Sequence, residues 1–228
     1  ITILPAGVAT AGNDTTVCGN NASVPLNGIV SGGAVTGAWS TSGTGVFVPS
    51  NTDLNATYIP SSADTAAGTV TLTLTANSCN AASDDLDITI TTAPYINAGP
   101  DQVVCVDALD VQLDGSAGGA STTAIWSSSG TGTFDPSNTT IDAVYHASSA
   151  DSASGSVTLV LTATNIGNCN AVNDTVVIDI LPAGVVNAGS DQILCSNNAD
   201  VQLNGTITGG ASEGIWSTSG SGTFVPND

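Results

Sequence analysis

The chain of 228 residues contains no lysine, no arginine and no methionine, and its single histidine is His146. Nineteen acidic residues give it a formal net charge of −19 at pH 7. Without cationic side chains the protein has nothing that neutralises phosphate groups, so binding to nucleic acid or to an anionic membrane surface is disfavoured. The same absence removes every trypsin cleavage site and every lysine that an isopeptide cross-link needs.

Charge of either sign is scarce, because charged residues make up only 8% of the chain, against about 25% in ordinary globular domains. Ser, Thr, Asn and Gly hold the polar positions instead, which is typical of an exported, protease-exposed surface protein. The hydrophobic share of 41% is enough to build cores, so disorder is not expected. No run approaches the ~20 apolar residues of a membrane span, and no signal peptide begins the chain. We therefore expect an internal piece of a longer protein, without membrane insertion.

A repeat of about ninety residues organises the chain. The phrase Ala-Gly-x-Asp begins at residues 11, 98 and 188, and a cysteine follows each copy four residues after its aspartate. A tryptophan within a WSTSGTG-like phrase comes later in each repeat. The cysteines are Cys18, Cys105 and Cys195, and the tryptophans are Trp39, Trp126 and Trp216.

These repeats divide the chain into four segments. Residues 1–6 are expected to be the last strand of a preceding repeat, because ITILPAGVATAG at the start is similar to IDILPAGVVNAG from residue 178. Residues 7–93 and 94–182 form two complete repeats, and residues 183–228 form the first half of a third. Such a window is what a cut from a long tandem array would give.

Each repeat is predicted to be all-β, since short alternating segments are separated by Gly, Asn, Pro and Ser clusters and no helical periodicity extends over ten residues. Seven strands in about ninety residues, with the tryptophan on the third, predict tandem immunoglobulin-like β-sandwich modules. The strands expected in the first repeat are 15–18, 23–30, 37–41, 46–48, 56–59, 69–76 and 85–91. The expected core includes the three tryptophans, Leu72 and its counterpart Leu159.

The sixth strand alternates strictly as TVTLTLTA from Thr69 to Ala76. Side chains on a strand point alternately to opposite faces, so Val and Leu should be buried and the threonines should face water. A threonine ladder could alternatively bind ice or glycan. The second repeat has SVTLVLTA here, with Val160 in place of Thr73. A ligand template should not tolerate this change, so we interpret the threonines as ordinary β-strand residues.

Several phrases in fixed order resemble a known class of repeat. AGPDQVVC, VQLDG, WSTSGTG, PSNT, PSSAD, VTLTLTA and CNA are similar to the PKD-like or Ig-like repeats of very large surface and secreted proteins of Bacteroidota. The charged WDFGDG-like phrase of typical PKD domains is replaced here by WSTSGTG. The resemblance covers the whole chain. It implies an extracellular array, exported through the outer membrane and often by type IX secretion, that serves as an adhesin, a gliding-associated filament or a surface fibre.

The resemblance also implies O-glycosylation, because members of that phylum attach glycans at Asp followed by Ser or Thr and then by a small or aliphatic residue or Thr. Four pairs fit this pattern, at Asp14-Thr15, Asp64-Thr65, Asp151-Ser152 and Asp174-Thr175. Thr65 and Ser152 are the best candidates because they occupy equivalent loops, SSADTAAG and SSADSASG. The alternative is that these are ordinary turn residues.

Cysteine placement predicts disulfides, since each complete repeat carries two cysteines in an apparently exported chain. The favoured pairing lies within repeats, as Cys18–Cys79 and Cys105–Cys169, and would stabilise each by about 4 kcal/mol in the chain-entropy picture. The alternative joins Cys18 to Cys169, from the first strand of one repeat to the late loop of the next. A partner for Cys195 would lie outside the chain. No CxxC pair supports a zinc or redox site.

No catalytic arrangement recurs in the repeats, so we expect no enzyme and no cofactor. His146 occupies the position of Ile59 in the first repeat and is interpreted as an exposed strand residue. Calcium is the one metal with candidate ligands at the junctions between repeats. These are Asp14, Asp101 and Asp191 at repeat entrances, and Asp84 and Asp174 near the last strand. The alternative is that their carboxylates bind nearby backbone amides in Asx turns.

Two functions follow from these observations. The first is a structural or adhesive extracellular protein that forms a stalk, fibre or filament on a bacterial surface, with disulfides and O-glycans. Its partners would be neighbouring repeats, like chains in a filament, and covalent glycans. The second is a glycan- or protein-binding module attached to a secreted enzyme or an adhesin head.

Overall fold

The computed structural model describes residues 5–78 and 80–225. Its contacts divide the chain into two compact units. The first comprises residues 1–97, 117–125 and 162–173, and the second comprises residues 98–116, 126–161 and 174–228. Hydrogen-bonded sheets, in contrast, follow the sequence repeats, because every sheet pairs strands of a single repeat.

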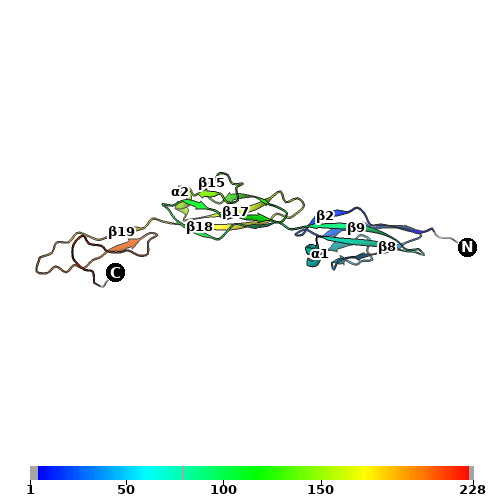
Figure 1. Cartoon of the computed structure of the whole chain (residues 1–228), viewed down its shortest axis with the longest axis horizontal. Helices are drawn as coiled ribbons and strands as arrows, with labels where there is room; N and C mark the ends of the chain where they lie inside the picture. Colours follow the sequence, from blue (N-terminus) through cyan, green and yellow to red (C-terminus); the bar gives the residue numbers. More distant parts are fainter. Residues whose placement is uncertain (1–4, 79, 226–228) are drawn as a thin grey trace. The chain divides into compact units, whose positions relative to one another are not determined.

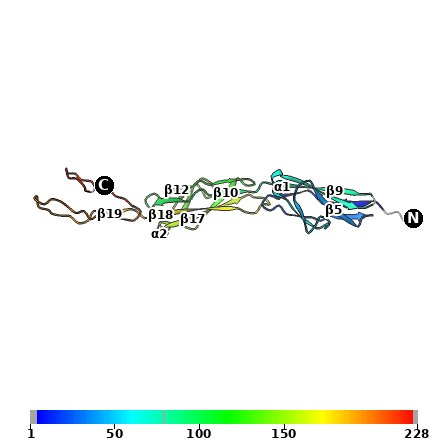
Figure 2. The same ribbon diagram turned by 90° about the horizontal axis from the view of Figure 1, so that it is seen from below.

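The first repeat contains a four-stranded sheet whose strands β2, β9 and β8 are labelled in Figure 1, and whose β5 is labelled in Figure 2. Across the sheet the order is β2 (Thr15–Cys18), β9 (Ala82–Thr91), β8 (Thr69–Asn77) and β5 (Thr36–Thr41). Strand β2 pairs parallel with β9, whereas β8 pairs antiparallel with both of its neighbours. The short β2 therefore runs beside the C-terminal part of β9.

A second sheet covers the first. It consists of β3 (Val24–Pro25), β7 (Thr57–Ile59) and β6 (Val46–Val48), while β1 (Gly7–Thr10) pairs with β4 (Ile29–Gly32). Two sheets with these pairings form an immunoglobulin-like sandwich, so the all-β fold predicted from the sequence is confirmed. One strand expected at 23–30 is divided into β3 and β4, because the chain leaves β7 and continues along β1.

The core between the sheets contains the strictly alternating strand. Along β8 the residues Val70, Leu72, Leu74 and Ala76 are at most 3% exposed, and the threonines between them are partly exposed. Trp39 from β5 and Tyr58 from β7 close the same core. On the other face, the hydroxyls of Thr71 and Thr73 donate to Asp87 and Asp85 on β9, at 2.7 Å each. The threonine face is thus bonded to its own sheet.

The second repeat has the same architecture. Its four-stranded sheet is β11 (Gln102–Cys105), β18 (Asn173–Leu181), β17 (Ser156–Thr164) and β14 (Thr123–Ser128). Its three-stranded sheet is β12 (Asp110–Gln112), β16 (Val144–His146) and β15 (Thr133–Asp135), and β10 (Tyr95–Asn97) pairs with β13 (Ser116–Gly118). Figures 1 and 2 label most of these strands. Trp126 and Leu159 occupy the core positions of Trp39 and Leu72.

The remaining segments differ from expectation. Most of the strand expected at 1–6 lies outside the described residues. In the third segment, β19 (Val185–Asn187) pairs with β20 (Thr206–Thr208). Trp216 is only half-buried there, which corrects its expected core position. The reason is that residues 183–228 contain no counterparts of β8 and β9, the strands that cover Trp39 in the first repeat.

Two short helices replace the expected loops before the sixth strands. They are α1 (Ser62–Ala67) and α2 (Ser149–Ser154). Ser61 begins α1 with a capping box, in which the Ser61 side chain and Asp64 bind each other's backbone amides, and Gly68 ends it in the left-handed conformation at φ 78°. In the described residues, no helix is long and apolar enough to cross a membrane.

We predict that the two faces of β8 differ in their contribution to stability. Leu72→Ala should lower the free energy of unfolding by about 2–5 kcal/mol, because it leaves a cavity among fully buried side chains. Thr73→Val should change it by no more than about 0.5 kcal/mol, because the side chain is on the wet face and the second repeat already carries Val160 there. Urea unfolding followed by tryptophan fluorescence measures both. A large cost for Thr73→Val would contradict this assignment of faces.

Candidate functional site

A disulfide joins Cys18, the last residue of β2, to Cys169 in the loop before β18. The two residues are 151 positions apart in sequence and their Cα atoms are 4.9 Å apart. Cys18 belongs to the first sequence repeat and Cys169 to the second, although both lie in the first compact unit. The bond therefore links consecutive repeats.

This bond corrects the favoured pairings, Cys18–Cys79 and Cys105–Cys169. Because β2 is parallel to β9, Cys18 lies opposite Thr91 at the end of β9. The loop that carries Cys79 precedes the start of β9 at Ala82, which is ten residues or roughly 30 Å away along the strand. Cys79 itself lies outside the described residues, and Cys105 is a free, exposed thiol.

Three asparagines that sequence analysis did not single out surround the disulfide. The Asn20 side-chain amide donates to the Asn170 carbonyl, and the Asn170 amide nitrogen donates to Asn20 Oδ1, both at 3.0 Å. Asn170 Nδ2 also donates to the Asn20 carbonyl, at 3.0 Å, and Asn168 Nδ2 donates to the Thr16 carbonyl, at 3.3 Å. An asparagine adjacent to Cys169 and another two residues after Cys18 are the signals that the sequence offered.

A second cluster is built around Asp64, whose side chain is buried although it carries a charge. The backbone amides of Thr44 and Gly45 donate to its two carboxylate oxygens at 2.8 and 2.9 Å. The Tyr58 hydroxyl and the Ser61 amide donate to Oδ2 at 2.8 and 3.0 Å. Four donors from three separate segments therefore converge on one carboxylate.

The glycines of the WSTSGTG phrase make room for this cluster. A Cβ atom on Gly43 would overlap the Asp64 carboxylate, and one on Gly45 would collide with the Tyr58 ring. The phrase is thus a turn that folds around an internal carboxylate. It differs from a phosphate-binding loop because its amides are already bonded to the protein itself.

These bonds fix the ionisation of the cluster. Burial by itself would raise the pKa of Asp64, but the hydrogen bonds from Thr44, Ser61, Tyr58 and Gly45 outweigh it, so this pKa lies below its ordinary value. Burial, followed by the neighbouring Asp64 as acceptor and charge, raises the pKa of the Tyr58 hydroxyl, although its bond to Thr41 opposes the shift. Asp64 is therefore ionised and Tyr58 neutral at pH 7.

The same cluster recurs in the second repeat. Asp151 accepts hydrogen bonds from the amides of Thr131, Gly132 and Ser148 and from the Tyr145 hydroxyl, all between 2.9 and 3.0 Å. Burial opposes the charge of Asp151, yet these bonds hold its pKa below the ordinary value. An arrangement present at both positions is a property of the repeat.

The cluster changes the interpretation of the two best glycosylation candidates. Thr65 and Ser152 are half-buried within the helices, and their hydroxyls donate to the carbonyls of Ser61 and Ser148 at 3.0 and 3.2 Å. The aspartate before each of them is buried. Among the other two candidates, Thr15 is half-buried and Thr175 is exposed.

The calcium candidates bind backbone amides instead of gathering around a cation. Asp84 accepts from the Ala11 amide at 2.8 Å, and Asp14 accepts from the Asp87 amide at 3.0 Å. These are long-range latches between the start of the repeat and its last strand, not the local Asx turns considered above. The second repeat repeats both latches, as Asp174 with Ala98 and Asp101 with Val177.

Asp191, the fifth calcium candidate, is exposed in the third segment. Within residues 5–78 and 80–225, no three acidic, histidine or cysteine side chains form a group suited to a metal ion. His146 is half-buried on β16, where Nδ1 lies 2.6 Å from Asp110 Oδ1 on the paired strand β12. The structure thus gives the histidine a cross-strand partner.

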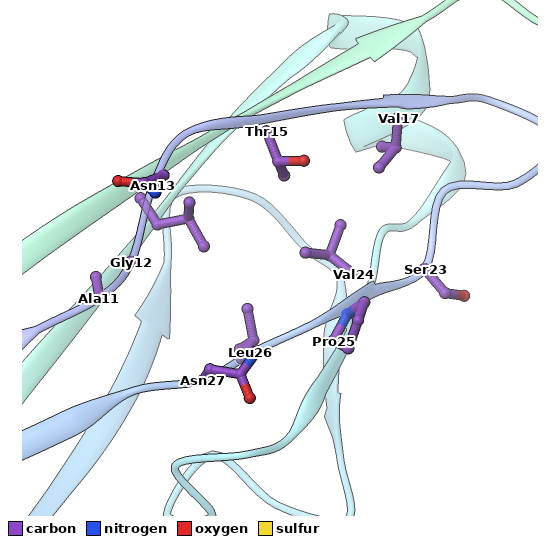
Figure 3. Close-up of a pocket in the computed structure, with 11 residues that line it drawn as sticks. Ala11, Gly12, Asn13, Thr15, Val17, Ser23, Val24, Pro25, Leu26 and Asn27 are labelled. Atoms are coloured by element: carbon purple, nitrogen blue, oxygen red, sulfur yellow. The ribbon is translucent and has the colours of Figure 1, made fainter. Parts of the chain in front are cut away.

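A small pocket of about 270 Å³ opens between β2 and β3, at one edge of the sandwich (Figure 3). Val17, Val24 and Leu26 give it an apolar lining, with Thr15 at the side. In the second repeat Gln102 replaces Thr15, and its side-chain amide donates to the Gln112 carbonyl at 3.0 Å. Thr15 is too short to make this bridge between the sheets.

No protein-family model matches the chain, and no curated protein sequence matches it either. Solved structures show similarity in fold. A three-Ig-domain fragment of titin has a TM-score of 0.46 and 16% identity, covering 81% of this chain and 68% of its own. The insect immune protein hemolin has a TM-score of 0.45 and 12% identity, with 75% and 46% covered. A mouse cadherin-23 fragment has a TM-score of 0.40 and 12% identity, with 78% and 67% covered.

We predict that Asp64→Asn destabilises the first repeat by about 3 kcal/mol, because converging amide donors lose their charged acceptor. The lowered pKa of Asp64 means that its contribution is present above the unfolded-state pKa, given as 3.8, and is lost as the pH falls through the folded value. The cost of the substitution should therefore be full at pH 7 and shrink below about pH 4.

Urea unfolding between pH 2 and pH 8 measures this effect. The matched control is Asp85→Asn, which removes an exposed aspartate that bonds only one threonine hydroxyl among the described contacts. It should cost no more than about 0.5 kcal/mol. An equal cost for both variants, or a cost of Asp64→Asn that persists undiminished at pH 2, would contradict a structural role for the ionised carboxylate.

Proposed function

We propose that this chain is part of an extracellular structural or adhesive array of Ig-like repeats. The observation that carries the proposal is the Cys18–Cys169 bond, which links consecutive repeats and is flanked by reciprocal hydrogen bonds between Asn20 and Asn170. Disulfides persist in oxidising compartments outside the cytosol. A protein whose repeats are bonded to each other, rather than only within themselves, is suited to transmitting load along the chain.

The recurring polar residues support a structural role. The aspartates that a metal or catalytic site would use bind backbone amides inside their own repeat, as Asp14 and Asp84 do in the first repeat and Asp101 and Asp174 do in the second. The buried Asp64 and Asp151 organise turns and helix caps. We propose a stalk, fibre or filament on a bacterial surface, of the kind the resemblance to Bacteroidota repeats implies.

The pocket beside Thr15 is the observation that favours the second function, a glycan- or protein-binding module. Its volume of about 270 Å³ is just below the range of about 300–1,000 Å³ typical of small-molecule sites. Its counterpart position in the second repeat is bridged by Gln102. A binding role confined to one repeat fits a tandem array less well than a structural role shared by both.

We predict that native, unreduced material forms thin fibres with beads spaced roughly 40 Å apart, the length of a ten-residue strand plus a short linker. Electron microscopy measures the spacing. Cys18→Ser should leave the beads in place and increase the bending between the first two repeats, because only the linkage is lost. Isolated globular particles that bind a glycan saturably would instead support the binding module.

We also propose O-glycosylation at Asp-Ser or Asp-Thr pairs, and the structure sets an order among them. If modification follows folding, Thr175 should be modified in preference to Thr65 and Ser152, whose preceding aspartates are buried. Intact mass and glycopeptide mapping of secreted protein test this order. Thr175→Ala should then remove most of the added mass and Thr65→Ala little. A mass equal to that of the polypeptide would overturn the proposal.

A further inference from the structure

The first-strand cysteine occupies the same local structure in all three repeats. A turn follows each one, in which the amide of Asn21, Ala108 or Asn198 donates to the carbonyl of the cysteine three residues earlier, at 2.8 to 2.9 Å. The residue directly after the cysteine also binds the end of the last strand. Gly19 donates to the Thr91 carbonyl at 2.8 Å, and Val106 donates to the Leu181 carbonyl at 2.9 Å.

The three cysteines differ in whether a partner covers them. Cys18 is 1% exposed and bonded to Cys169, the late-loop cysteine of the next repeat. Cys105 and Cys195 are exposed free thiols. Cys105 pairs in register with Leu181 at the end of β18, as Cys18 pairs with Thr91 at the end of β9. The late loop of its own repeat is therefore a full strand length away, as it is for Cys18.

We propose that Cys105 and Cys195 are covalent attachment sites for the late-loop cysteine of the repeat that follows each of them. Cys79, a late-loop cysteine in sequence, would correspondingly take the first-strand cysteine of the repeat before its own. Each internal repeat then uses its two cysteines in two different disulfides, one at each end. This inference rests on the proposed array and adds the register of its covalent links.

The bonds that flank the disulfide fit this register. Asn197 corresponds to Asn20, so all three of the asparagine contacts seen at Cys18 are available beside Cys195. Asp107 takes that position beside Cys105. Its carboxylate can accept from a late-loop backbone amide, as Asn20 Oδ1 does, and its carbonyl can accept from an asparagine side chain, as the Asn20 carbonyl does. Only the donation made by Asn20 Nδ2 has no equivalent there.

The chemistry is thiol–disulfide exchange. The two cysteine thiols together give up two electrons and two protons to an external small-molecule or enzyme disulfide, which is released as two thiols. A mixed disulfide on the exposed Cys105 is the intermediate, and the late-loop thiolate attacks its Cys105 sulfur.

Disulfide mapping of the native protein tests the proposal. The protein is isolated without reduction, its free thiols are blocked with N-ethylmaleimide, and its peptides are identified by mass spectrometry. Since the sequence around Cys105 differs from that around Cys18 and Cys195, its peptide is diagnostic. We expect it to be linked to a late-loop peptide of the following repeat. Finding Cys105 blocked as a free thiol, or linked to Cys79 or Cys195, would overturn the proposal.

A recombinant pair provides the matched control. The chain is extended after Asp228 with a copy of residues 139–182, which completes the third repeat and supplies a copy of Cys169. In glutathione redox buffer, Cys105 should lose its reactivity toward N-ethylmaleimide in the extended chain and keep it in the 228-residue chain. Changing the copied cysteine to serine should restore it. If Cys105 stays reactive while Trp216 fluorescence shows burial, the register is wrong.

The two proposals fail separately. Fibres with Cys105 unbonded would retain the array and reject the register of its links. Isolated particles in which Cys105 is linked to the following repeat would retain the register and reject the fibre.

Discussion

The parallel pairing of β2 with β9 is the constraint on which the linkage between repeats depends. It places Cys18 beside Thr91, where the repeat ends, and leaves the late loop at the other end of a ten-residue strand. A disulfide requires Cα atoms within about 7 Å, so a bond within the repeat would require the sheet to come apart. The same strand direction therefore turns two cysteines per repeat, which look like an internal pair, into one connector at each end.

A second, independent device holds each repeat together from within. The Asp64 carboxylate binds the SGTG turn, the cap of α1 and the Tyr58 hydroxyl, so that three connections between strands share one acceptor. A buried charge is costly unless it is fully hydrogen-bonded, and here four donors meet it. This explains why a chain without lysine or arginine can bury an aspartate: backbone amides and hydroxyls supply what cationic side chains supply elsewhere.

Much of the fold could be predicted from the sequence, because alternation along the sixth strand and the tryptophan of the third report directly on burial. The site could not, because its determinants are not periodic. Strand direction decided the partner of Cys18, and alternation carries no information about direction. Asp14 and Asp84 latch segments 73 residues from their acceptors' donors, where residue type alone suggested calcium or a local turn. Helix α1 is too short for helical periodicity, although Ser61, Asp64 and Gly68 signalled its caps.

The position of the disulfide also decides what it stabilises. In the chain-entropy picture, closing a loop of 151 residues destabilises the unfolded chain by about 5 kcal/mol. A bond within one repeat would assign its whole gain to that repeat. A bond between repeats acts fully only when both unfold, since a folded second repeat already restrains Cys169 relative to its own linker. In a linear array, intrinsic stability and coupling between neighbours are separate terms. The Asp64 cluster contributes to the first and the Cys18–Cys169 bond to the second, so covalent coupling is added without altering the core of either repeat.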